Sequence, residues 1–213
     1  MRWIVDFLCS SIGKKQLMAL TGFCFLGFIT VHLAGNLSIF GGPRMLDAYA
    51  DKLKSLGPLI LVMELGLVFL ACVHVGMGLW LFYKNFTARP QRYAVSASAG
   101  GKTLSSRTMP YSGLLILTFI VIHLLNFRFA DLSAMGLSEI AARIFGNPVY
   151  SGFYVVIMVV LGFHVRHGFW SAFQTVGANH PQYMPTIEKL AVIFAIVVAA
   201  GFGSLPIFVL ITG

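Results

Sequence analysis

Five long apolar runs, separated by short polar segments, dominate the hydrophobic pattern of the chain. Each run holds about 20 residues or more with almost no charge, which is the length that an α-helix needs to cross a bilayer. We therefore predict an all-α membrane protein with a single transmembrane domain over residues 1–213. The five predicted transmembrane helices span approximately residues 16–40, 57–83, 108–127, 148–173 and 190–211.

Composition supports the membrane assignment, and charge predicts an orientation. Hydrophobic residues make up 58% of the chain, charged residues make up 10%, and the mean hydropathy is +0.85. This composition leaves too little polar surface for a soluble protein. With the N-terminus in the cytoplasm, nine basic residues fall on the inner side and five on the outer side, so we predict a cytoplasmic N-terminus. On that inner side the acids are Asp6 and Glu188, and the resulting net charge of +7 favours acidic lipid or an acidic soluble partner; we expect no nucleic acid.

Two histidine-containing segments occur twice in the chain. Residues 28–33 match residues 119–124, and residues 74–80 match residues 164–170, with offsets of 91 and 90 positions. Similarity at a fixed spacing predicts a duplicated two-helix unit, which supplies one histidine to each of the first four predicted spans. The four histidines are His32, His74, His123 and His164.

The depth of each histidine follows from its position in its span. Each one comes 15 to 17 residues after the start of a span, while the direction of the chain alternates. His32 and His123, the outer pair, therefore lie in the outer half of the bilayer, and His74 and His164, the inner pair, lie in the inner half. A rise of about 1.5 Å per residue separates the two levels by roughly 10 Å. We predict two stacked sites.

A pair of imidazoles facing each other across an apolar bundle is suited to the axial ligation of haem iron. A polar ring inside the hydrocarbon layer is unfavourable, so four matched histidines indicate function more than packing. We predict two b haems. Their iron ligands are His32 and His123 for the outer haem, and His74 and His164 for the inner haem.

Nearby residues bear on the identity of the metal. Gly35, Gly78 and Gly168 lie three or four positions after a histidine and leave room for a ring edge on the same helix face. Zinc or copper is the competing metal, but no carboxylate or thiol lies within a turn of these histidines. His167 shares a face with His164, although the repeat aligns His164 with His74, so we prefer His164 as the ligand.

Haem propionates are anions that need a cationic or hydroxyl partner near the ends of the helices. Arg128, Arg143 and Tyr154 are our candidates at the outer haem. Lys84 and Arg107 are our candidates at the inner haem. For each of them, an ordinary role as an anchor at the membrane surface remains the alternative.

The segments 11–15, 31–37, 74–80 and 164–173 together resemble a known family. Over essentially its whole length, the chain is similar to the dihaem cytochrome b membrane anchor subunit of succinate dehydrogenase and quinol:fumarate reductase. The resemblance implies five transmembrane helices and the two haems assigned above. It also implies a flavoprotein subunit and an iron–sulfur subunit on the cytoplasmic face of a bacterial inner membrane, with electrons relayed to or from a membrane quinone.

The resemblance further implies a quinone site near the outer haem, and many members of the family use menaquinone. Glu64 is the only acid inside a predicted span and lies near the outer-haem level. We expect its carboxyl group to exchange protons with the quinone; a carboxyl hydrogen-bonded between helices is the alternative. Some relatives carry an acid just before the histidine of the fourth helix. Residues 161–163 read Leu-Gly-Phe here, so a proton route at that place is unsupported.

The expected function is therefore an electron-transfer anchor. Succinate–fumarate chemistry would occur on a partner, because the chain has no soluble domain to bind a dicarboxylate; its own share would be the quinone site. Another dihaem cytochrome b is the nearest alternative, but the bc-type places two ligand histidines on each of two helices. A proton-coupled transporter with a histidine relay is the alternative from a different class.

Overall fold

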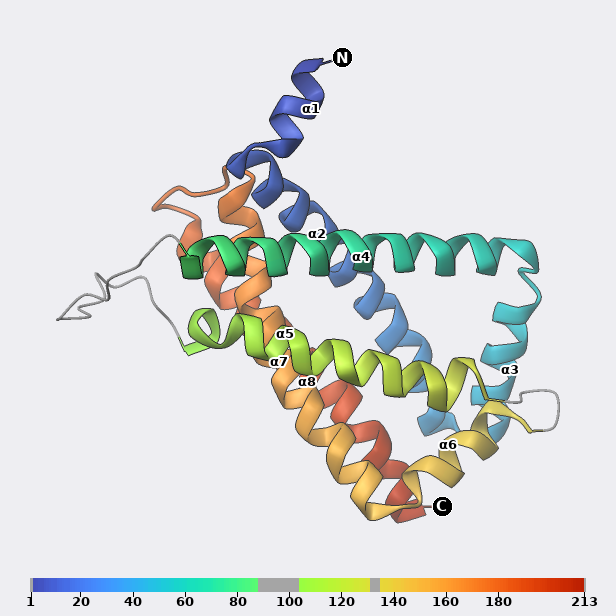
Figure 1. Ribbon diagram of the computed structural model, residues 1–213. Helices are drawn as coiled ribbons and strands as arrows, with labels where there is room; N and C mark the ends of the chain where they lie inside the picture. Colours follow the sequence, from blue (N-terminus) through green and yellow to red (C-terminus); the bar gives the residue numbers. More distant parts are fainter. Residues whose placement is uncertain (1, 88–103, 131–134, 213) are drawn as a thin grey trace.

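The computed structural model describes residues 2–87, 104–130 and 135–212, without the side chains of residue 85 and residues 104–107. Within these ranges the chain is almost entirely helical and contains no β-strand (Figure 1). The prediction of an all-helical protein is confirmed.

Five of the helices are long and apolar enough to cross a membrane, as predicted. They begin and end somewhat differently from the expected spans; the last one begins six residues earlier, at Met184. Two of them continue into a short segment of another helical type, η1 (Leu37–Gly41, 3-10) after α2 and η2 (Leu124–Arg128, a π-helical turn) after α5. The five long helices are α2 (Ser11–Asn36), α4 (Pro58–Thr87), α5 (Leu104–His123), α7 (Pro148–Thr175) and α8 (Met184–Thr212).

Three short helices complete the described fold, and the hydrophobic pattern did not predict them. α1 (Arg2–Cys9) precedes α2 and projects away from the bundle, whereas α3 (Pro43–Lys54) and α6 (Leu137–Phe145) meet at the other end of the long helices (Figure 1). α3 connects α2 to α4, and α6 connects α5 to α7. The order long helix, short helix, long helix therefore occurs twice before α8.

Local sequence explains where several helices begin. The side chain of Asn147 accepts hydrogen bonds from the backbone N–H groups of Val149 and Tyr150, and Pro148 occupies the first turn of α7. Ser10 accepts from the N–H of Gly13 in the same way at the start of α2. These caps satisfy backbone donors that a helix leaves free at its N-terminus.

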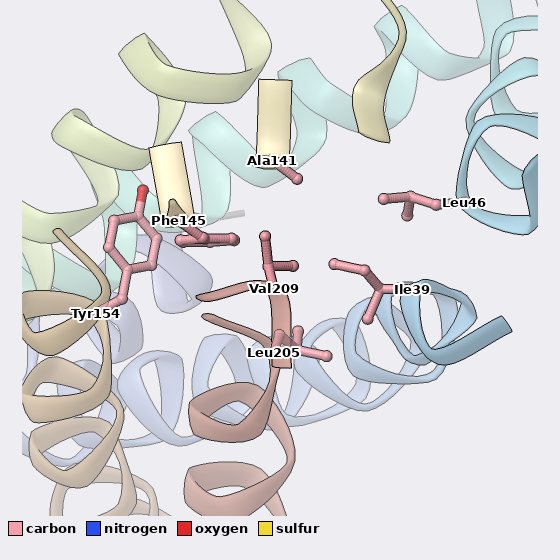
Figure 2. Packing of buried hydrophobic residues seen from close by; sticks show 7 residues of the cluster. All are labelled: Ile39, Leu46, Ala141, Phe145, Tyr154, Leu205 and Val209. Carbon is pink, nitrogen blue, oxygen red and sulfur yellow. The ribbon is translucent and has the colours of Figure 1, made fainter. Parts of the chain in front are cut away.

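One cluster of buried residues, called the buried core below, lies at the end of the bundle where α3 and α6 meet. Each short helix turns one apolar face inward, with Leu46 and Ala50 on α3 and Ala141 and Phe145 on α6, at the four-residue spacing of a helix face. Figure 2 shows the side chains of this cluster converging from η1, α3, α6, α7 and α8. Its members are Ile39, Leu46, Ala141, Phe145, Tyr154, Leu205 and Val209.

The long helices differ in how much protein covers them. α7 and α8 form the most extensive helix pair, and Gly162 allows it, because a Cβ at that position would lie 3.0 Å from the Cβ of Ala199. α4 has no buried residue among the side chains that the structure describes, and it packs mainly against α2. Apolar side chains therefore cover most of the surface of α4, as expected of a helix that faces lipid.

Candidate functional site

The outer pair of histidines is brought together by α2 and α5. The ring centres of His32 and His123 lie 6.0 Å apart, and their planes are nearly perpendicular, at 85°. His123 is the last residue of α5, directly before the π-helical turn. A metal bound about 2 Å from one nitrogen of each ring would set the ring centres about 6 Å apart. The separation of the outer pair therefore fits two axial ligands of one metal ion.

Aromatic rings surround the outer pair and repeat with the histidines. Phe28 stacks on His32 with ring centres 5.2 Å apart, and Phe119 stacks on His123 at 5.7 Å. In both cases the phenylalanine comes four residues before the histidine on the same helix face. Phe202 of α8 lies 5.7 Å from His32. The outer pair thus lies in apolar surroundings.

The polar contacts of the outer pair are few. The side-chain nitrogen of Asn36 lies 3.4 Å from Nδ1 of His32 and donates a hydrogen bond to the carbonyl oxygen of the same residue at 2.8 Å. Nδ1 of His123 is buried and has no hydrogen-bond partner among the described residues. An unpaired buried nitrogen is unfavourable, so this level has an unsatisfied polar group.

The inner pair has a different set of partners. Nδ1 of His74 on α4 lies 3.0 Å from the hydroxyl oxygen of Thr21 on α2. Nδ1 of His164 on α7 lies 3.0 Å from the hydroxyl oxygen of Ser112 on α5. Thr21 and Ser112 are 4% and 6% exposed, and they are 91 positions apart in the sequence. The same hydroxyl–imidazole contact therefore forms in both halves of the chain.

A glycine follows each of these hydroxyl residues and lies close to the ring, although a Cβ at either position would make only an ordinary van der Waals contact. A Cβ at Gly22 would lie 3.8 Å from Cε1 of His74, and a Cβ at Gly113 would lie 3.5 Å from Cε1 of His164. No ring contact joins His74 to His164 in the part of the chain that the structure describes, whereas the outer rings are adjacent.

The glycines that we expected to open a slot have other neighbours. A Cβ at Gly35 would collide with the phenol ring of Tyr49 on α3, and a Cβ at Gly78 would lie 3.4 Å from the terminal methyl of Met18. Of these three glycines, only Gly168 would have no neighbouring atom within 4 Å of an added Cβ. At Gly35 a tyrosine thus takes the space that we had assigned to the edge of a porphyrin.

Glu64 and Arg128, which we predicted for separate tasks, form one ion pair. Nε and Nη2 of Arg128 donate to the two carboxylate oxygens of Glu64 at 2.7 Å and 3.0 Å, which links α4 to η2. The side chain of Glu64 is 33% exposed and that of Arg128 is 52% exposed. A bidentate pair fixes the direction of both side chains and leaves further guanidinium donors free for another acceptor.

Tyr154 lies close to the outer pair, with its ring centre 6.3 Å from that of His123. The residue is 5% exposed, and its hydroxyl oxygen accepts a hydrogen bond from the side chain of Asn126 at 3.1 Å. Its ring belongs to the cluster of Figure 2, so packing is one clear role of this side chain.

The other three propionate candidates are exposed or lie outside the described side chains. Arg143 is exposed in the last turn of α6. Lys84 is exposed near the end of α4, with its ammonium group 5.4 Å from the centre of the Trp80 ring. The side chain of Arg107 lies outside the described residues.

Sequence reasoning missed a second contact between residues 91 positions apart. The carboxylate of Asp47 on α3 accepts hydrogen bonds from the backbone N–H and the hydroxyl of Ser138 on α6, at 2.8 Å and 2.6 Å. This contact joins the two short helices next to the buried core. Extending the 91-residue offset beyond the histidines would have found Ser138, and also Thr21 with Ser112, as equivalent positions.

Comparisons of the chain with protein-family models, curated proteins and solved structures each found no match. In the part of the chain that the structure describes, no three His, Cys, Asp or Glu side chains gather into a metal site. A metal ion held by two histidines needs further ligands, and the four nitrogens of a porphyrin would supply them. The donor set of the outer pair therefore fits haem.

Proposed function

We propose that the chain is the membrane anchor and electron-transfer subunit of a succinate:quinone oxidoreductase complex. In this proposal His32 and His123 ligate an outer b haem, and His74 and His164 ligate an inner b haem. When bound, each haem supplies an iron that gains and loses one electron. The observation that carries the proposal is one histidine on each of four apolar helices, with matching neighbours at each level.

Contacts between equivalent residues support a duplicated two-helix unit, made of α2 with α4 and α5 with α7. Two pairs of residues 91 positions apart touch each other, His32 with His123 and Asp47 with Ser138. The hydroxyl–imidazole contacts repeat with nearly the same spacing. Equivalent residues meet at an axis when two copies of a unit pack symmetrically, and a bundle of this kind holds its cofactor between facing helices.

The chain's own residues would orient the imidazoles and keep water away from them. The phenylalanines stacked on the outer pair hold each ring from one side. The hydroxyls of Thr21 and Ser112 hold Nδ1 of each inner ring. Groups of this kind, next to the ligands of a metal, set ligand orientation and basicity.

The proposed partners are a flavoprotein subunit and an iron–sulfur subunit on the cytoplasmic face of a bacterial inner membrane. One end of the bundle is basic: the ammonium groups of Lys14 on α2 and Lys84 on α4 lie 4.9 Å and 5.4 Å from the centre of the Trp80 ring. Basic residues at the ends of spans favour the cytoplasmic side, which supports a cytoplasmic N-terminus. Succinate–fumarate chemistry would take place on the flavoprotein.

The proposed share of this chain in catalysis is a site for a membrane quinone, in the first place menaquinone. Glu64 is the candidate for proton exchange, and one-third of its side chain is exposed. Arg128 would hold the carboxylate of Glu64 in place and keep donors for a quinone oxygen or a haem propionate. A carboxylate that is both positioned and accessible is suited to proton transfer with a quinone.

A reduced-minus-oxidised absorption spectrum of the purified chain, with haem quantified per chain, tests the proposal. We expect b-type bands and two haems, each with two histidine ligands by electron paramagnetic resonance. Absence of any haem band would reject the proposal and leave the histidine relay of a proton-coupled transporter as the next hypothesis. Copurification of flavoprotein and iron–sulfur subunits tests the assembly.

A further inference from the structure

The hydroxyl oxygens of Thr21 and Ser112 lie within hydrogen-bond distance of Nδ1 of the inner histidines, where they can determine which ring nitrogen carries the proton. We propose that both are positioning residues of the inner centre: each accepts a hydrogen bond from Nδ1–H of its histidine, so that Nε2 keeps the free electron pair that binds a metal. The inference deepens the proposed function and rests on it for the identity of the metal group. The choice of tautomer itself depends only on the chain.

The single proton of each hydroxyl has a carbonyl acceptor on its own helix. Oγ1 of Thr21 lies 2.9 Å from the carbonyl oxygen of Leu17 and 3.1 Å from that of Met18. Oγ of Ser112 lies 3.1 Å from the carbonyl oxygen of Met109. A carbonyl oxygen accepts hydrogen bonds and cannot donate them, so each hydroxyl donates its proton to its own helix.

The proton of each hydroxyl–imidazole hydrogen bond then has to come from the imidazole. A hydroxyl that has given its proton to a carbonyl can only accept from Nδ1, so His74 and His164 must carry a proton there. The opposite arrangement, with the hydroxyl donating to Nδ1, forms one hydrogen bond instead of two. It also leaves two oxygen lone pairs facing each other about 3 Å apart in a buried place, which is unfavourable.

A neutral imidazole protonated at Nδ1 has its free electron pair at Nε2, the usual nitrogen for a metal. The arrangement occurs in both halves of the chain, with the hydroxyl residue almost fully buried each time. The hydroxyl residues lie 91 positions apart and the histidines 90, so the contact repeats at nearly one offset, which favours a functional role over chance packing.

The outer pair lacks this device and serves as an internal control. The group next to Nδ1 of His32 is an amide nitrogen, which donates, and Nδ1 of His123 has no partner among the described residues. A change at Thr21 or Ser112 should therefore affect the inner centre alone.

The main test is a redox titration of the holoprotein carrying Thr21→Val or Ser112→Ala. Each variant removes the acceptor for Nδ1–H, which makes the imidazole a weaker donor to ferric iron. We expect the midpoint potential of the inner haem to rise while that of the outer haem stays unchanged. The matched controls Thr21→Ser and Ser112→Thr keep a hydroxyl and should preserve the wild-type potential.

Unchanged inner potentials in Thr21→Val and Ser112→Ala would overturn the inference, as would equal shifts in the hydroxyl-preserving controls. A second measurement separates this inference from the proposed function. Nitrogen-15 spectra of the full chain prepared without haem distinguish protonated from unprotonated ring nitrogens. We expect His74 and His164 to carry the proton at Nδ1 in the wild type and to lose that preference in the two variants. A proton at Nε2 in the wild type would overturn the tautomer assignment, whether or not the chain binds haem.

Discussion

The outer pair of histidines lies on α2 and α5 and the inner pair lies on α4 and α7, and the two pairs have different surroundings. The outer rings lie 6.0 Å apart between stacked phenylalanines, and Nδ1 of His123 has no hydrogen-bond partner in the described parts of the chain. The inner rings are not in contact with each other, and each has a buried hydroxyl at its Nδ1. The outer pair is thus distinguished by the contact between its two rings, and the inner pair by the hydrogen bonds at Nδ1 of each ring. Each level therefore joins two histidines that lie 90 or 91 positions apart in the sequence, and the two levels differ in the contacts of their imidazoles.

Two single variants, each lacking one histidine of one level, are expected to have the largest effect on haem content. We expect His164→Ala to lose the inner haem and keep the outer one, and His123→Ala to do the reverse, because each haem would need both of its ligands. Haem content should fall from about two per chain to about one in each variant. Quantification of haem and a difference spectrum measure the loss.

The control for this experiment is His180→Ala, since His180 is exposed in the turn before α8 and belongs to neither pair. It should keep both haems. Full haem content in His164→Ala would contradict the ligand assignment of the inner pair.

The ion pair between Glu64 and Arg128 belongs to the outer level, and its disruption has the next largest expected effect. We expect Glu64→Gln to slow quinone turnover about a hundredfold, the lower range for a positioned acid or base, while both haems remain. Steady-state quinone reduction by the whole complex measures this. Normal turnover in Glu64→Gln would remove Glu64 from the mechanism.

The companion variant Arg128→Gln separates the two tasks predicted for that arginine. Loss of outer-haem affinity in Arg128→Gln, with full affinity in Glu64→Gln, would assign Arg128 to a propionate. Equal slowing of turnover in both variants, with both haems retained, would assign it to the positioning of Glu64.

A smaller effect is expected where α3 joins α6, next to the outer level. Asp47→Ala removes the acceptor for two hydrogen bonds of Ser138 and should destabilise the protein by about 1–3 kcal/mol. Thermal unfolding in detergent, followed by circular dichroism, measures the change. Asp51→Ala on the same helix is the control, because Asp51 is exposed and its pair with Lys54 contributes little. Equal stability of the two variants would show that the contact between α3 and α6 is not important for folding.

The fold was largely predictable where local sequence decides it. A run of apolar residues long enough to cross a bilayer must satisfy its backbone hydrogen bonds internally, so five such runs indicate five helices without any tertiary information. The short helices α3 and α6 were missed because they are amphipathic and short. They are stabilised by tertiary packing more than by their own length: α3 packs against η1 and α6, and α6 also packs against α7 and α8.

The number of long apolar helices and the repeated spacing of the histidines can be read without any tertiary information, because both are patterns along one dimension. Only the tertiary structure decided which side chains meet: the hydroxyls of Thr21 and Ser112 with the inner imidazoles, and Glu64 with Arg128. These contacts join residues that lie 52 to 64 positions apart. They depend on how helices rotate and cross, which is set by packing over the whole bundle and is not encoded in any single segment.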